Sequence, residues 1–308
     1  MSVDAKRGWR ASVVPVLAVI AAIVVIWYLA AAMLNLTWEY DQSEREVAKG
    51  KEPVAFSQML SNTMSQKRPK LPAPHQVAEE LWKTSGAIGV KRGFDKMLTS
   101  KRSLIHHAWI TLAPTLLGFV FGTALGMLLA IGIVHNRAMD MSVMPWVIAS
   151  QTIPIIATAP MIIIVLNAVG ISGLIPKAII AMTLSFFPVT VGMVKGLRSP
   201  DAMQLDLMRT YNASSGATLR KLRLPSSLPY LFTSMKIAVA ASLVGAIVAE
   251  LPTGAVAGLG ARLLAGSYYG QTVQIWSALL MASFVAAALV GIVGLIGRLV
   301  ERRMGMAR

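Results

Sequence analysis

Long apolar runs separated by short polar segments constrain this chain more than any other feature. The first run covers residues 13–34 and contains no charged side chain. A helix that spans a membrane needs about 20 consecutive apolar residues, whereas the core of a signal peptide needs only about 7–15. Although Ala30, Ala31 and Ala32 resemble a cleavage site, the length predicts an uncleaved spanning helix.

Five further apolar runs follow the first. Hydrophobic residues make up 55% of the chain and charged residues only 14%, whereas soluble domains have about 25% charged residues. We therefore predict an all-α membrane protein with six transmembrane helices. The further runs cover residues 108–134, 143–166, 174–194, 230–251 and 275–297.

The basic residues predict the orientation. The short connections 167–173 and 252–274 contain one basic residue between them, Arg262. The remaining short connections are rich in Lys and Arg. Because positive charges gather in cytoplasmic loops, we predict that both termini lie in the cytoplasm. We expect a first helix within residues 1–34, an extracytoplasmic segment at 35–107, a five-helix permease-like core at 108–303, and a tail at 304–308.

The net charge of +15 would suggest nucleic acid in a soluble protein. Here the basic residues lie between apolar runs, so membrane topology and lipid headgroups account for them and nucleic acid is not expected. The chain has no cysteine, which excludes disulfides and thiolate chemistry. Adjacent His106 and His107 lack acidic neighbours in the sequence, so no metal site is expected.

Two sequence features outside the basic loops predict local structure. Gly118, Gly122 and Gly126 recur every four residues on one helix face, which favours close helix packing within the subunit over a dimer contact. Residues 37–70 are polar, mixed in charge and rich in Ser, Gln and Lys. This composition predicts a partly disordered segment, and a short helix is expected after it through Val77, Leu81 and Trp82.

The segment 195–229, between the fourth and fifth runs, predicts two short helices. Ser199 is the expected cap of the first, with Pro200 at its opening position. Asn212 is expected to end it, because Asn tolerates the left-handed conformation. Ser214 is the expected cap of a second helix at residues 215–222, which the later prolines should stop. An amphipathic loop lying on anionic lipid would have the same pattern.

Here the sequence resembles a known family. Residues 206–214, followed by Pro225 and Pro229, are similar to the EAA loop of ABC-importer permeases. Asp206 replaces the usual Glu and Asn212 the usual Gly. Residues 71–74, the glycines of the second run, and Ala249-Glu250 with residues 258–260 resemble permeases of the nitrate/sulfonate/taurine type. The resemblance covers residues 71–303.

The resemblance implies a permease subunit of the bacterial inner membrane that is not itself an enzyme. Its partners would be ABC ATPase subunits, an extracytoplasmic solute-binding protein, and a second permease subunit in a homodimer or heterodimer. The chain has no Gly-x-x-x-x-Gly-Lys-Ser/Thr phosphate loop, so it needs no cofactor of its own and ATP would bind the partner. The residues implied in coupling to the ATPase are Asp206, Arg209, Asn212, Ala213, Ser214, Ser215, Gly216, Leu219, Leu224, Pro225 and Pro229.

Polar residues inside the runs are the candidates for a solute pathway. Glu250 is an acid inside an apolar run, and such groups face either a cavity or a hydrogen-bond partner. Gln151, Thr152 and Pro154 interrupt the third run and Ser185 the fourth, where helix–helix hydrogen bonds are the alternative. The solute is expected to be small and organic or anionic. An ion-coupled secondary transporter is the alternative function, although such proteins usually carry several buried acids and internal repeats. A membrane-embedded enzyme ranks last.

Overall fold

A computed structural model describes residues 3–305, which form helices and connecting loops with no strand among them. The chain divides into two compact units. Unit 1 comprises the residues up to Met97 together with Leu263–Leu280, and unit 2 comprises Leu98–Arg262 together with Met281–Arg308. Each unit is described by itself below.

The predicted all-α membrane fold is confirmed. Within the described residues, five helices are long and apolar enough to cross a membrane. A bent pair of helices brings the number to six if the pair is one span, as the sequence predicts. The long helices are α1 (Val3–Val47), α6 (Leu104–His135), α9 (Leu174–Leu197), α12 (Leu224–Glu250) and α14 (Thr272–Arg303).

Unit 1 is built on α1, which extends well past its apolar part. The remaining helices that start in its first segment are α2 (Phe56–Thr63), α3 (Pro74–Thr84), α4 (Gly86–Arg92) and α5 (Phe94–Thr99). The buried Asn35 side chain joins α1 to the segment beyond α2. Its Oδ1 accepts from Lys70 N at 2.9 Å, and its Nδ2 donates to Leu71 O at 2.9 Å.

The predicted partial disorder of residues 37–70 is therefore wrong for much of the segment. Residues 37–47 continue α1, and α2 packs back on that extension. Gln66 supports the packing, since its Nε2 donates to Glu39 Oε1 at 2.6 Å. Composition missed this arrangement because the polar side chains satisfy one another and the backbone rather than water. The short helix expected through Val77 is confirmed as α3.

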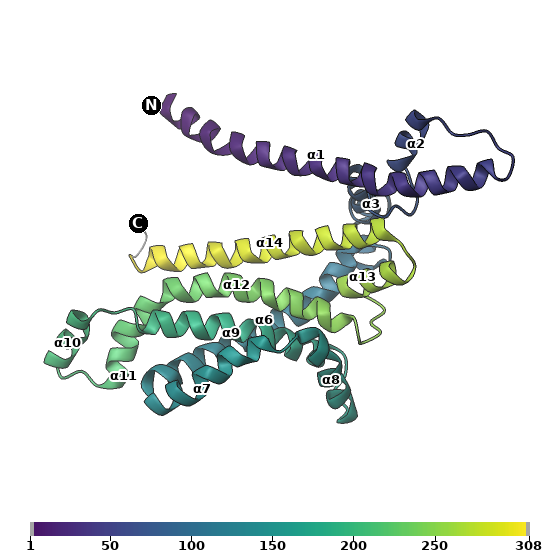
Figure 1. The fold of residues 1–308 in the computed structure, drawn as a ribbon. Coiled ribbons are helices and arrows are strands. Elements are labelled where there is room, and N and C mark those ends of the chain that lie inside the picture. Colours follow the sequence, from purple (N-terminus) through teal and green to yellow (C-terminus); the bar gives the residue numbers. More distant parts are fainter. Residues whose placement is uncertain (1–2, 306–308) are drawn as a thin grey trace. The chain divides into compact units, whose positions relative to one another are not determined.

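Unit 2 is centred on α6, α9 and α12, which lie side by side (Figure 1). The glycine face of α6 lies against α9, as predicted for packing within the subunit. A Cβ added at Gly118 would stand 2.7 Å from the carbonyl oxygen of Ala178, and one added at Gly126 would stand 2.7 Å from that of Phe186. Side chains would therefore force these two backbones apart.

The third apolar run is sharply bent in unit 2. It forms α7 (Arg137–Ala149), the short 3₁₀ helix η1 (Ser150–Thr152) and α8 (Ile155–Ala168). The two α-helices meet at 102°. Pro154 explains the break, since it has no N–H and disfavours helical geometry in the residue before it. The remaining helices are α10 (Ala202–Thr210), α11 (Ser215–Thr218), the π-helix η2 (Leu219–Arg223) and α13 (Leu259–Tyr268).

Candidate coupling loop and solute pocket

The loop between α9 and α12 contains the predicted helix–turn–helix. The cap of α10 is Asp201, whose Oδ1 accepts from Gln204 N at 2.8 Å, while Gln204 Oε1 accepts from Asp201 N at 3.3 Å. The expected cap at Ser199 is wrong, because Ser199 Oγ donates to Gly196 O and so ends α9 instead. A carboxylate two residues later satisfies the helix donors, and a reciprocal Gln completes a capping box.

The turn after α10 has the geometry that the sequence predicts. Asn212 has a φ of 50°, the only positive φ among the described residues other than glycine. The chain reverses there, with Ala213 N donating to Met208 O at 2.9 Å. Ser214 then caps α11, since its Oγ accepts from Ala217 N at 3.3 Å. The predictions for Asn212 and Ser214 are confirmed.

The prolines do not stop the second helix, contrary to the prediction. α11 passes through η2 directly into α12, and Ser215–Glu250 forms one long helical segment. Pro225 lies in the first turn of α12, where the wider turn of η2 precedes it, and Pro229 lies inside α12. A π-turn relieves the clash between a proline ring and the preceding carbonyls. The helix α11 of the loop and the membrane helix α12 are therefore parts of one continuous helical segment.

The residues implied in coupling fall into an exposed group and a half-buried group. Asp206 and Arg209 form an exposed ion pair with an Nη1–Oδ1 distance of 2.9 Å, a kind of pair that contributes little to stability. Leu219 and Leu224 pack against the core of unit 2. The exposed group is Asp206, Arg209, Asn212, Ser214, Ser215 and Gly216, and the half-buried group is Ala213, Leu219, Leu224, Pro225 and Pro229.

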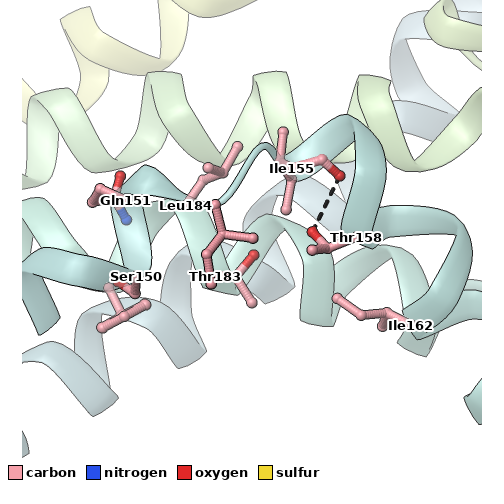
Figure 2. Close-up of a pocket in the computed structure, with 9 residues that line it drawn as sticks. Ser150, Gln151, Ile155, Thr158, Ile162, Thr183 and Leu184 are labelled. Carbon is pink, nitrogen blue, oxygen red and sulfur yellow. Dashed lines mark hydrogen bonds between the residues drawn. The ribbon is translucent and has the colours of Figure 1, made fainter. Parts of the chain in front are cut away.

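A pocket lies at the bend between α7 and α8, against α9 (Figure 2). Its volume is about 240 Å³. The lining combines hydroxyl groups, one amide, aliphatic side chains and a phenyl ring, and it includes no charged residue. The lining residues are Ser150, Gln151, Ile153, Ile155, Thr158, Ile162, Thr183, Leu184 and Phe186.

The polar residues predicted to line a pathway do not all meet at this pocket. Gln151 lines it. Thr152 Oγ1 donates to Ala149 O at 2.8 Å, and the carbonyl oxygen of Pro154 accepts from the first turn of α8. Ser185 is buried on α9 and donates to Gly118 O at 3.1 Å, which joins α9 to α6.

Sequence reasoning missed Ser150, Thr158 and Thr183, which line the pocket beside Gln151. Hydroxyl residues inside apolar runs are the feature that would have found Thr158 and Thr183. Each of these two hydroxyl groups also donates to a backbone carbonyl of its own helix, so the sequence alone does not show whether it faces a pocket. Thr183 Oγ1 donates to Ile180 O at 2.7 Å, so a pocket-lining threonine is already satisfied within its helix.

Glu250 lies in a buried hydrogen-bond network and does not line this pocket. The carboxylate accepts from Thr111 Oγ1 at 2.8 Å and from Gly260 N at 2.7 Å. Thr111 Oγ1 also accepts from Leu259 N at 2.8 Å. The geometry therefore supports the hydrogen-bonding alternative for Glu250, in which one acid joins the start of α6 to the loop after α12.

Glycine is needed where the loop after α12 passes Glu250. Gly258 has a φ of +131°, and a Cβ there would stand 2.4 Å from the Glu250 carboxylate. The Gly258 N–H donates to Nδ1 of the buried His107 at 3.0 Å. Nδ1 is therefore the unprotonated nitrogen, and Nε2 donates to Lys101 O at 3.0 Å. This arrangement fixes the ring as a structural contact, and no group of metal-ligating residues occurs in the described part of the chain.

The described residues thus form a multi-pass membrane protein with a pocket at a bent span and an exposed helical segment that continues into a membrane helix. The chain belongs to the family described as binding-protein-dependent transport system inner membrane component, which matches residues 122–306. The resemblance to ABC-importer permeases of the nitrate and sulfonate type is thereby confirmed.

Two relatives and one solved structure illustrate the similarity. A Haemophilus influenzae protein named "Probable ABC transporter permease protein" is 29% identical over 63% of this chain and 77% of its own length. The riboflavin transport system permease protein RibX of Chloroflexus aurantiacus is 29% identical over 75% and 80%. A solved amino acid ABC transporter chain shares the fold, with a TM-score of 0.51 and 15% identity over 65% of this chain and 93% of that one.

This chain is accordingly a permease subunit of an ABC transporter and a multi-pass protein of the inner membrane. It is a transport component rather than an enzyme. Membership of this family implies ATPase and binding-protein partners in general.

Proposed function

We propose that this permease works in an ATP-driven importer and pairs with a second permease subunit, most simply another copy of itself. An extracytoplasmic binding protein delivers a small, uncharged or weakly charged organic solute. Separate ATPase subunits bind ATP and dock on the exposed residues of α10, the Asn212 turn and α11. The chain itself then needs no cofactor.

The continuity of α11, η2 and α12 is the observation that carries this proposal. A force applied to α11 reaches the membrane helix α12 through one continuous helical segment, Ser215–Glu250. Leu219 and Leu224 anchor the same segment in the core of unit 2. Movement of the turn must therefore move α12 or repack that core, which is what a lever between an ATPase and a pathway requires.

The pocket at the bend of the third span supports the choice of solute class. Gln151 offers an amide, Thr158 and Thr183 offer hydroxyl groups, and Phe186 offers a ring. A small number of polar groups in an apolar lining is typical of sites for small organic ligands. The missing counter-charge disfavours a strongly charged solute, because a desolvated ion without a partner is costly.

The 35–70 segment supports a docking site for the binding protein in unit 1. Lys67 and Arg68 line two grooves, with volumes of about 330 and 510 Å³. The exposed Trp38 lines the larger groove. Acidic residues line the same grooves, namely Glu39 in the larger one and Glu79 and Glu80 in the smaller one. A mixed-charge surface next to an exposed indole is suited to a partner surface with complementary charges, since charge steers the encounter and an aromatic side chain provides contact area.

Reconstitution in proteoliposomes with the cognate ATPase and binding protein tests the proposal. Solute uptake should require ATP and both partners. The double substitution Asp206→Lys and Ala213→Asp should abolish uptake while ATP hydrolysis by the assembled subunits continues. Ala138→Asp, on the exposed start of α7, is the control and should transport normally. Uptake by this chain alone, or normal coupled uptake in the double variant, would refute the proposal.

A further inference from the structure

A second cavity lies between the coupling loop and the end of α6, and Arg209 of the exposed ion pair is among its lining residues. Its volume is about 290 Å³, and it is lined from α6, α10, α11 and η2. Three basic side chains line it, namely His135, Arg209 and Arg223, together with the hydroxyl residues Ser215 and Thr218. No acidic side chain is among the residues of the lining.

The basic groups keep donors that the protein does not use. Arg209 meets Asp206 through Nη1 alone, and the pair is largely exposed, so solvent screens it. Arg223 makes one long contact, from Nη1 to Leu197 O at 3.5 Å. His135 Nδ1 lies 2.9 Å from Ile131 O, to which it donates, and in the imidazolium form the Nε2–H is the donor left for an anionic ligand.

The chemistry of this lining fits an oxyanion. A guanidinium presents several N–H donors in a planar fork that matches phosphate or sulfate oxygens. Serine and threonine hydroxyls add donors that need no charge. A water molecule occupies about 30 Å³ of liquid, so the cavity has room for a tetrahedral ion that keeps part of its hydration shell.

We propose that this cavity binds a small tetrahedral oxyanion of the phosphate or sulfate class and thereby ties the coupling loop to the end of α6. The bound ion bridges Arg209 on α10 and Arg223 on η2 to His135 on α6. Because α10 and η2 flank the Asn212 turn, bridging them stiffens the lever. Occupancy therefore slows the conformational change that the ATPase drives, and the site inhibits transport.

Binding itself does not depend on the proposed import function, but the inhibition does. The oxyanion has two possible sources, a free cytoplasmic ion and the phosphate of an anionic lipid headgroup. Both supply the same tetrahedral group to the same three side chains. The lipid composition of the test membrane separates the two sources.

Calorimetry on the purified permease in nanodiscs of phosphatidylcholine, which carries no net charge, tests the binding. Sulfate and inorganic phosphate are titrated at constant ionic strength against chloride. Saturable binding is expected, and Arg223→Gln and His135→Gln should each weaken it by about tenfold or more, because each removes a charge-assisted hydrogen bond. Arg137→Gln is the control, since Arg137 is exposed, lies two residues from His135 and does not line the cavity.

Each result has a defined meaning. Loss of binding in Arg137→Gln as well, or an equal response to chloride, means general screening and overturns the proposal. Unchanged binding in both cavity variants also overturns it. Arg223→Lys keeps the positive charge but lacks the planar set of N–H donors of arginine. Partial binding by this variant, with a normal melting temperature, would show that the loss of binding in Arg223→Gln is not due to misfolding. Nanodiscs with phosphatidylglycerol identify the source: weaker sulfate binding indicates that the headgroup competes, and unchanged binding indicates a free ion.

The assembled transporter tests the inhibition. Sulfate should lower its ATP hydrolysis and uptake together, and Arg223→Gln should remove that sensitivity while transport persists. If calorimetry succeeds but the assembled complex shows no uptake under any condition, the import function fails and the anion site stands. If uptake is normal and insensitive to sulfate, the inhibitory role is wrong.

Discussion

Thr111 on α6 donates a hydrogen bond from Oγ1 to Oε1 of Glu250 on α12 at 2.8 Å, and both side chains are buried. This hydrogen bond joins two residues that are 139 positions apart in the chain. Gly260 N reaches the other carboxylate oxygen at 2.7 Å. The carboxylate therefore holds the loop after α12 against the start of α6.

Replacing this acid should destabilise the bundle. Glu250→Ala leaves Thr111 Oγ1 and Gly260 N without their acceptor, and each unsatisfied buried donor costs about 1–3 kcal/mol. We expect a clear fall in the melting temperature of the purified protein by scanning fluorimetry. Glu52→Ala, in an exposed loop, is the control. An unchanged melting temperature in Glu250→Ala would show that the network does not stabilise the fold.

Close packing of α6 on α9 makes Gly118 sensitive to a single methyl group. A Cβ at this position would meet Ala181 Cβ at 2.5 Å and Ala178 O at 2.7 Å, and a backbone oxygen cannot move away alone. Gly118→Ala should therefore lower the melting temperature, despite the better helix propensity of alanine. At Gly291 on α14 a Cβ would meet nothing within 4 Å. Gly291→Ala should be neutral or stabilising, and equal effects at the two sites would contradict this packing.

Asn35 should control the order of the segment that composition alone predicts to be disordered. Its side chain bonds the backbone at Thr63, Lys70 and Leu71. Asn35→Ala removes these contacts at once, so the segment around α2 should open and be cleaved by trypsin after Lys67 at least several-fold faster. Gln42→Ala, which is exposed on α1, is the control. Equal cleavage of both variants would mean that Asn35 does not hold the segment.

The sequence predicts well where one physical rule acts alone. Apolar length gave the spanning helices, and the tolerance of Asn212 for left-handed geometry gave the turn. It fails where two rules compete. Ser199 and Asp201 are both residues that can cap a helix. The structure shows that Ser199 Oγ donates to Gly196 O at the end of α9, so Asp201 caps α10. Pro225 and Pro229 are helix breakers in isolation, but the π-turn before α12 accommodates Pro225 in the first turn, and α12 continues past Pro229.

The candidate site follows the same division. The exposed residues of the coupling loop can be found from their local pattern, because capping and turn geometry are encoded within a few positions. The sequence does not distinguish Glu250 and Ser185 from Gln151, since each is a polar residue in an apolar run. Their partners, Thr111 and Gly118, lie far away in the chain. Tertiary contacts therefore decide which polar residue lines a pocket.

The backbone at Asn212 gives the sharpest test of the lever. Its φ of 50° is easy for glycine and costs about 1–2 kcal/mol for a residue with an ordinary side chain. Asn212→Gly should therefore keep coupled transport, whereas Asn212→Val should strain the turn between α10 and α11. In reconstituted transporter we expect Val to lower uptake per ATP hydrolysed by at least several-fold, with normal insertion and a melting temperature only a few degrees lower. Equal coupling by the Gly and Val variants would show that this turn does not transmit the movement.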